Sequence, residues 1–134
     1  MGFMRLYRGL KEPYRPERTL ATIRETRQGT DFTGCPYTAL LYATGRRGVV
    51  IVLDLPDDAG PPRVTEEFWP GTKAKRLMVW GTFDRYVAGL IQAKELRVEV
   101  RRRGLAVLGD DGRSRVLRRR IDELLAASGA SNGR

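Results

Sequence analysis

Residues 36–55 have the sequence PYTALLYATGRRGVVIVLDL, which predicts a helix followed by a buried strand. Proline suits the first turn of a helix, because its missing N–H needs no partner there. Ala39, Leu40 and Ala43 would form one apolar stripe, and the next glycine would end the helix. Residues 48–55 are apolar on both faces, which is typical of a central strand that is covered on both sides.

Short strand patterns flank this stretch on both sides. They lie at 3–8, 30–33, 63–69, 76–80 and 85–91, and residues 19–26 fit either a helix or a strand.

The C-terminal third is less uniform. Leu96, Val98 and Val100 alternate with charged residues, which predicts a half-buried strand, although a helix over 93–103 also fits. A turn is expected at 110–112. Ser114 would then cap an amphipathic helix of about thirteen residues.

Together these elements predict an α+β fold, because strands and helices do not alternate as in a doubly wound parallel sheet. We expect a single domain over residues 1–128, followed by a flexible tail at 129–134. The domain would hold a mixed or antiparallel sheet of roughly six to seven strands with about two to three helices.

Composition excludes several kinds of chemistry. The 134 residues contain no histidine, so the Ser-His-Asp triad, the Cys-His pair and His-ligated zinc are excluded. The single cysteine, Cys35, excludes internal disulfides and cysteine-rich metal clusters, and we interpret it as a small buried residue. No metal site is therefore predicted.

No apolar run approaches a membrane span or a signal sequence, so we expect a cytoplasmic protein without a membrane partner.

The charge is strongly positive and uneven. Lys plus Arg is 25 and Asp plus Glu is 16, a net +9, and residues 97–120 alone hold nine basic and three acidic side chains. Such a segment favours nucleic acid or an acidic protein surface. One hypothesis is therefore a non-enzymatic regulator that binds nucleic acid, or a nucleic-acid-processing machine such as RNA polymerase, through residues 97–120. The candidate contacts are Arg101, Arg102, Arg103, Arg115, Arg118 and Arg119.

A second hypothesis comes from the order of several short motifs. The sequence Leu-Tyr-Arg-Gly ends at Gly9, Gly-Thr-Asp-Phe-Thr ends at Thr33, and Ala-Leu-Leu-Tyr-Ala begins at Ala39. The strand at 48–55 follows them. Over about residues 5–96 this order resembles the core of the ADP-ribosyltransferases, in the branch whose first strand carries an arginine. The resemblance implies NAD as cofactor and a macromolecular target.

The resemblance also implies roles for particular residues. Arg8 would hold the phosphates or the nicotinamide ribose of NAD, since a guanidinium pairs well with phosphate oxygens. Thr30 and Thr33 would line the nicotinamide pocket, and Tyr37 or Tyr42 could stack on the cationic ring.

The catalytic carboxylate is where this sequence departs from the family. When Tyr86 is aligned with the aromatic residue after the family's catalytic glutamate, an arginine occupies the glutamate position. The remaining candidates are Asp84, one residue earlier, and Glu66 and Glu67 on the strand at 63–69. Without a correctly placed glutamate, transfer would be slow or absent, and the protein would be a degenerate member of the family.

Overall fold

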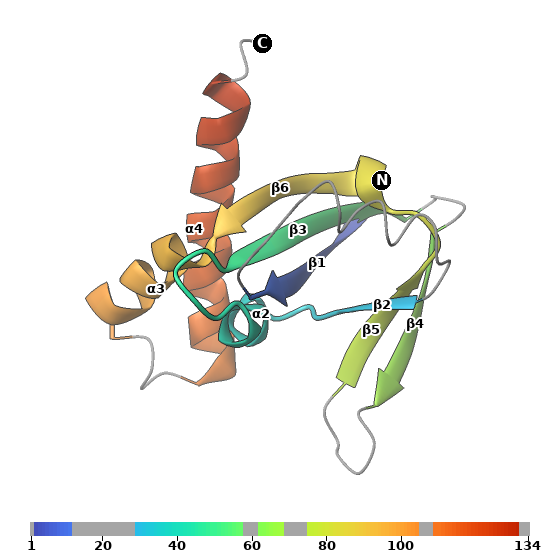
Figure 1. Cartoon of the computed structure of the whole chain (residues 1–134), viewed down its shortest axis with the longest axis horizontal. Coiled ribbons are helices and arrows are strands. Elements are labelled where there is room, and N and C mark those ends of the chain that lie inside the picture. Colours follow the sequence, from blue (N-terminus) through green and yellow to red (C-terminus); the bar gives the residue numbers. More distant parts are fainter. Residues whose placement is uncertain (1, 12–28, 58–61, 69–74, 105–108, 132–134) are drawn as a thin grey trace.

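The computed structural model describes residues 2–11, 29–57, 62–68, 75–104 and 109–131. Within these ranges six strands and three α-helices form an α+β fold (Figure 1), which confirms the predicted class. In chain order the elements are β1 (Phe3–Leu10), β2 (Gly29–Phe32), α2 (Pro36–Tyr42), β3 (Val49–Pro56), β4 (Arg63–Phe68), β5 (Lys75–Trp80), the 3-10 helix η1 (Asp84–Tyr86), β6 (Val87–Gln92), α3 (Ala93–Arg102) and α4 (Asp110–Ser131).

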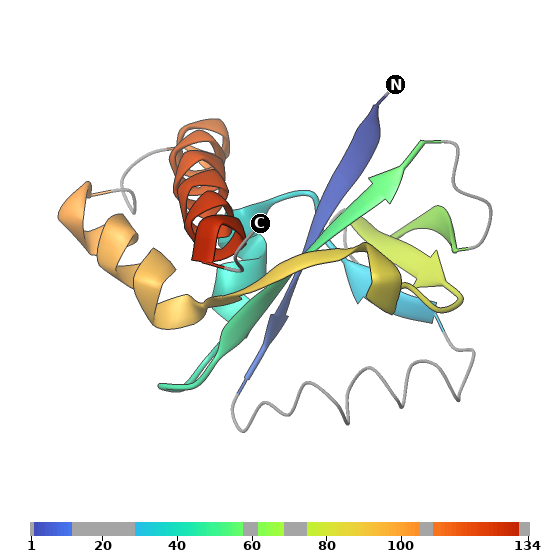
Figure 2. The same ribbon diagram turned by 90° about the horizontal axis from the view of Figure 1, so that it is seen from above.

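The strands form two sheets of three, whereas the sequence predicted one larger sheet. Sheet A has the order β1-β3-β6, sheet B has the order β2-β5-β4, and all pairings are antiparallel. The two sheets meet at one bridge, where the backbones of Tyr7 and Thr33 exchange hydrogen bonds of 2.8 and 2.9 Å. Seen from above, sheet A lies between the helices on one side and sheet B on the other (Figure 2).

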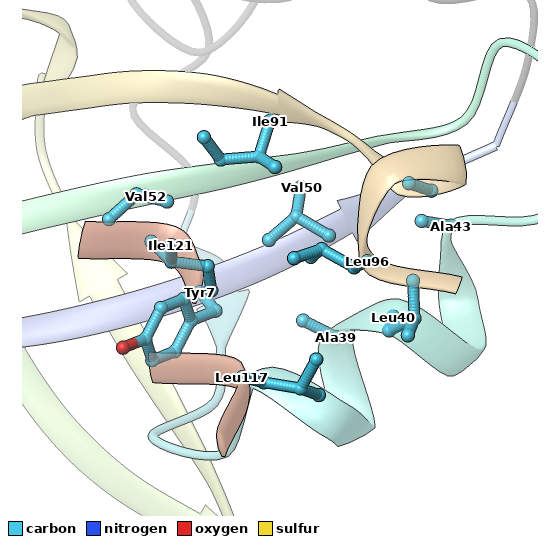
Figure 3. Close-up of a cluster of buried hydrophobic side chains, with 11 residues drawn as sticks. Tyr7, Ala39, Leu40, Ala43, Val50, Val52, Ile91, Leu96, Leu117 and Ile121 are labelled. Atoms are coloured by element: carbon cyan, nitrogen blue, oxygen red, sulfur yellow. The ribbon is translucent and has the colours of Figure 1, made fainter. Parts of the chain in front are cut away.

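Strand β3 is the centre of this arrangement, as its apolar sequence predicts. Its residues from Val49 to Leu53 are buried, and alternate side chains enter two different clusters. Val50 and Val52 pack with α2, α3 and α4 in a cluster that also holds Tyr7, Leu96, Leu117 and Ile121 (Figure 3). Ile51 and Leu53 pack toward sheet B. One strand therefore supplies both halves of the hydrophobic core.

Two predictions in the C-terminal third are wrong, and one alternative is confirmed. Residues 96–100 lie in α3 rather than in a strand, so the helical alternative over 93–103 holds. Leu96 is fully buried against α4 while Val98 is 48% exposed, a pattern that the helix period explains. The predicted turn at 110–112 is instead the start of α4.

The remaining boundaries shift by less. Helix α4 has 22 residues rather than about thirteen and runs into the predicted tail, to Ser131. The strand expected at 85–91 begins with the 3-10 helix η1 and continues as β6, and the helix expected over 36–44 ends at Tyr42. The prediction for residues 19–26 lies outside the described residues. No helix of the described ranges is long and apolar enough to span a bilayer.

Candidate functional site

Arg8 stands on β1 beside the point where that strand passes under α2. Gly9 makes this close approach possible, because a Cβ at Gly9 would lie 1.9 Å from the carbonyl oxygen of Ala39. Tyr42 lies three residues after Ala39 on α2, so the two side chains lie on the same side of the helix. Residues of α2 are thereby held next to the strand that carries the arginine.

A pocket of about 390 Å³ opens between β1, the end of β2, α2 and one side chain of β5. Its volume lies at the low end of the range of roughly 300–1,000 Å³ that small-molecule sites occupy. The lining combines backbone, hydroxyl, aromatic and charged groups. The described lining residues are Tyr7, Arg8, Gly9, Leu10, Lys11, Asp31, Phe32, Thr33, Thr38, Ala39, Tyr42 and Arg76.

Arg8 is fixed in this pocket by Asp31. Its Nη1 donates to the Asp31 backbone oxygen at 2.9 Å and also pairs with the Asp31 carboxylate. Its Nε is buried and has no hydrogen-bond partner among the described residues. A buried donor without an acceptor costs about 1–3 kcal/mol. The guanidinium is therefore positioned by one carboxylate and still has donor capacity for an anion.

Three of the five predicted cofactor residues meet in this pocket. Arg8, Thr33 and Tyr42 line it, although they come from separate parts of the sequence. Tyr42 is 60% exposed, so its ring offers an accessible aromatic face. The Thr33 hydroxyl accepts a hydrogen bond from the Cys35 N–H at 3.1 Å, which orders the turn into α2.

The other two predicted cofactor residues lie outside the lining. Thr30 is buried on β2 and sits two residues from Phe32, so both side chains enter the core between the sheets. Tyr37 lies on α2 beneath Arg113, whose guanidinium carbon is 4.5 Å from the ring centroid. Tyr37 is therefore engaged with α4 rather than with the pocket.

None of the three predicted catalytic carboxylates lines the pocket. Asp84 belongs to η1, and Glu66 is an exposed residue of β4. Glu67 comes closer, because it is the register partner of Arg76, which does line the pocket. Nη2 of Arg76 lies 3.5 Å from Oε1 of Glu67. Glu67 is therefore linked to the pocket through its ion pair with Arg76.

The sequence did not reveal Lys11, Arg76, Thr38 or Asp31 as site residues. Arg8, Lys11 and Arg76 are basic and Asp31 is acidic, so the described lining carries a net +2. Asp31 lies inside the Gly-Thr-Asp-Phe-Thr motif without being assigned a role, and Arg76 reaches the pocket only through the pairing of β5 with β2. The excess positive charge favours an anionic ligand.

Two residues have shifted pKa values: Tyr7, which lines the pocket, and Cys35, which precedes α2. Burial raises the pKa of the Tyr7 hydroxyl, and Arg118 only partly opposes this effect. Burial also raises the pKa of the Cys35 thiol, but hydrogen bonds from Ser114 and Thr38 outweigh it, so this pKa lies below its usual value. The Cys35 sulfur is 3.2 Å from the Ser114 hydroxyl oxygen, and Cys35 is partly exposed, whereas the sequence predicted a buried residue. Among the described residues no group of three or more acidic, cysteine or histidine side chains could hold a metal ion.

The arginines of residues 97–120 make different contacts in the structure. Arg101, Arg102 and Arg103 are exposed at the end of α3, where Arg103 pairs with Glu99 at 2.6 Å. Arg118 instead points from α4 to the backbone oxygen of Gly34, at 2.8 Å. Arg115 and Arg119 are exposed on α4, and a small cleft brings Arg119 close to Arg103, Glu99 and Glu123.

Comparison with known proteins adds no relative. No family model matches the chain, and no curated protein or solved structure matches it.

Proposed function

We propose that this chain is an ADP-ribosyltransferase-like protein that binds NAD in the pocket beside Arg8. One observation carries the proposal: Arg8, Thr33 and Tyr42 come from three segments of the chain and line the same pocket. These are residues that the resemblance assigns to NAD, and nothing in their spacing along the sequence requires them to be neighbours.

The chemistry of the pocket fits this cofactor. The diphosphate of NAD is anionic, and the positive charges of Arg8, Lys11 and Arg76 can bind it. The exposed Tyr42 ring can stack on the nicotinamide or adenine ring. Because the pocket holds only about 390 Å³, we expect it to enclose one part of NAD and to leave the rest at its rim.

Group transfer makes a further demand on the residues. When bound, NAD supplies a C–N bond whose cleavage leaves positive charge on the ribose, and a nearby carboxylate would stabilise that charge. Asp31 already pairs with Arg8, and Glu67 approaches the pocket only through Arg76. We therefore propose that NAD binding is the main activity and that transfer is slow, with Glu67 as the carboxylate that supports it.

Calorimetric titration with NAD tests the proposal. The wild-type chain should bind NAD, and Arg8→Ala should weaken binding by about tenfold or more, since hydrogen bonds to charged groups are worth about 1.5–3 kcal/mol. Arg63→Ala removes an equal charge from an exposed position of β4, outside the pocket lining, and should leave the affinity unchanged.

Two results would overturn the proposal. One is the absence of binding by the wild-type chain at millimolar NAD. The other is full affinity in Arg8→Ala, measured on a variant whose thermal unfolding shows that it is folded.

A further inference from the structure

A second cationic site lies at one end of sheet A, apart from the residues that the sequence singled out. A groove of about 630 Å³ is lined by Arg46, Arg47, Val49, Gln92, Lys94 and Arg97. Four of these six residues are basic and none is acidic. They come from the loop before β3, the end of β6 and the first half of α3.

The loop that carries Arg46 and Arg47 is held rigidly against α3. The two Nη atoms of Arg97 donate to the backbone oxygens of Ala43 and Gly45, each at 2.8 Å. Gly45 has a φ of 87°, a conformation that glycine adopts without strain. The Ala93 N–H donates to the Gly48 oxygen at 2.9 Å and fixes the loop's other end.

A preformed groove of this kind loses little conformational entropy when a ligand binds. Arg46, Arg47 and Lys94 are exposed residues of this groove. The nearest acidic residue in the sequence, Glu95, has a carboxylate oxygen 3.8 Å from Arg120 and is therefore directed toward α4. The described lining of the groove contains no carboxylate.

We propose that this groove binds the phosphodiester backbone of a nucleic acid. Guanidinium groups match phosphate oxygens in geometry, and three of the four basic side chains are arginines. A protein partner would need an apolar contact at the centre of its interface, but the only aliphatic side chain of the described lining is the buried Val49. The chemistry therefore favours phosphates over an acidic polypeptide.

The groove and the pocket beside Arg8 lie at the same end of sheet A. Val49 pairs with Leu10 on one side and with Gln92 on the other. Leu10 and Lys11 line the pocket, while Val49 and Gln92 line the groove. Neighbouring strands are about 4.8 Å apart, so a strand of nucleic acid in the groove would pass close to the pocket. Nucleic acid in the groove would then be the target of transfer, and this part of the inference rests on the proposed function.

The groove also refines the hypothesis for residues 97–120. Of that segment only Arg97 lines it, and Arg101, Arg102 and Arg115 lie elsewhere on α3 and α4. Exposed arginines on other elements provide a control that changes the net charge by the same amount: Arg63 on β4, Arg85 on η1 and Arg115 on α4.

Fluorescence anisotropy with a labelled single-stranded oligonucleotide, without NAD, tests the inference. The variant Arg46→Gln/Arg47→Gln/Lys94→Gln should bind about tenfold or more weakly at moderate salt. Its plot of log affinity against log salt concentration should be shallower by about 2, since each lost phosphate contact on a single strand removes about 0.7. The control Arg63→Gln/Arg85→Gln/Arg115→Gln should stay within about twofold of wild type in affinity, because these residues lie outside the groove lining.

Several outcomes would overturn the inference: no binding by wild type, an equal loss in the two triple variants, or displacement of the oligonucleotide by polyglutamate at comparable charge concentration.

Calorimetry with NAD on the groove variant keeps the two proposals separate. Lost oligonucleotide binding with retained NAD binding supports the groove as a distinct site. If Arg8→Ala loses NAD binding but still binds the oligonucleotide, this result also supports two distinct sites.

Discussion

At the residue scale, Gly9 decides how close α2 can come to Arg8. A Cβ there would lie 1.9 Å from the Ala39 oxygen and 2.9 Å from the Ala43 nitrogen, and both are backbone atoms. Neither can rotate away as a flexible side chain could. The absence of a side chain at Gly9 is therefore what allows α2 to form one wall of the pocket.

We predict that Gly9→Ala destabilises the protein by about 2–3 kcal/mol, the usual cost of forcing an extra methyl into a packed site. Gly34→Ala is the matched control, because a Cβ at Gly34 meets nothing within 4 Å and its φ is not positive. Urea unfolding of the two variants measures the difference. Equal midpoints would show that α2 shifts without cost.

At the element scale, the register of β4 on β5 ranks the candidate carboxylates. Glu67 is opposite Arg76, and Glu66 is opposite Leu77. Because successive side chains of a strand point to opposite faces, only one of the two glutamates can share the face of Arg76. Asp84 lies beyond β5, in η1. The pairing therefore favours Glu67.

We predict slow release of nicotinamide from NAD that is lost in Glu67→Gln and retained in Glu66→Gln and Asp84→Asn. Removing one stabilising group for transition-state charge typically lowers the rate by about 10²–10³-fold. Chromatographic detection of nicotinamide, with NAD affinity measured on the same variants, checks this. Release that survives in Glu67→Gln would exclude that carboxylate.

At the scale of the whole molecule, the pocket depends on how sheet A packs on sheet B. Phe83 is fully buried in the cluster between the sheets, and its ring meets Phe32 edge to face, with centroids 5.2 Å apart. Leu6 and Ile51 from sheet A and Val79 from sheet B complete the contact. The position of Arg76 relative to Arg8 follows from this packing, since the two residues belong to different sheets.

We predict that Phe83→Ala lowers the free energy of unfolding by about 3–5 kcal/mol, through lost burial and the cavity left behind. Phe68→Ala removes the same side chain from a position that is 58% exposed, and its effect should be within about 0.5 kcal/mol. Chemical denaturation compares the two. A small loss in Phe83→Ala would mean that the sheets collapse onto the cavity.

Local periodicity predicted the elements whose pattern fits only one structure. The apolar run in β3 and the stripe of Leu117 and Ile121 in α4 are of this kind. Leu96 and Val100 satisfy both periods, whereas Val98 fits only the strand period, and packing against α4 decided for the helix. Thr30 and Thr33 both fitted a hydroxyl motif, but their odd spacing on an extended chain turns them to opposite sides. That spacing was visible in the sequence.

The sequence by itself determined the α+β class, the central strand, the absence of histidine chemistry and the excess of positive charge. These properties depend on composition and on contacts between near neighbours in the chain. Only the tertiary structure decided that the strands divide into two sheets, that Arg76 and Lys11 join Arg8, and that Arg46, Arg47, Lys94 and Arg97 share a groove. Such groupings depend on strand pairing and helix packing between distant segments, which no local pattern encodes.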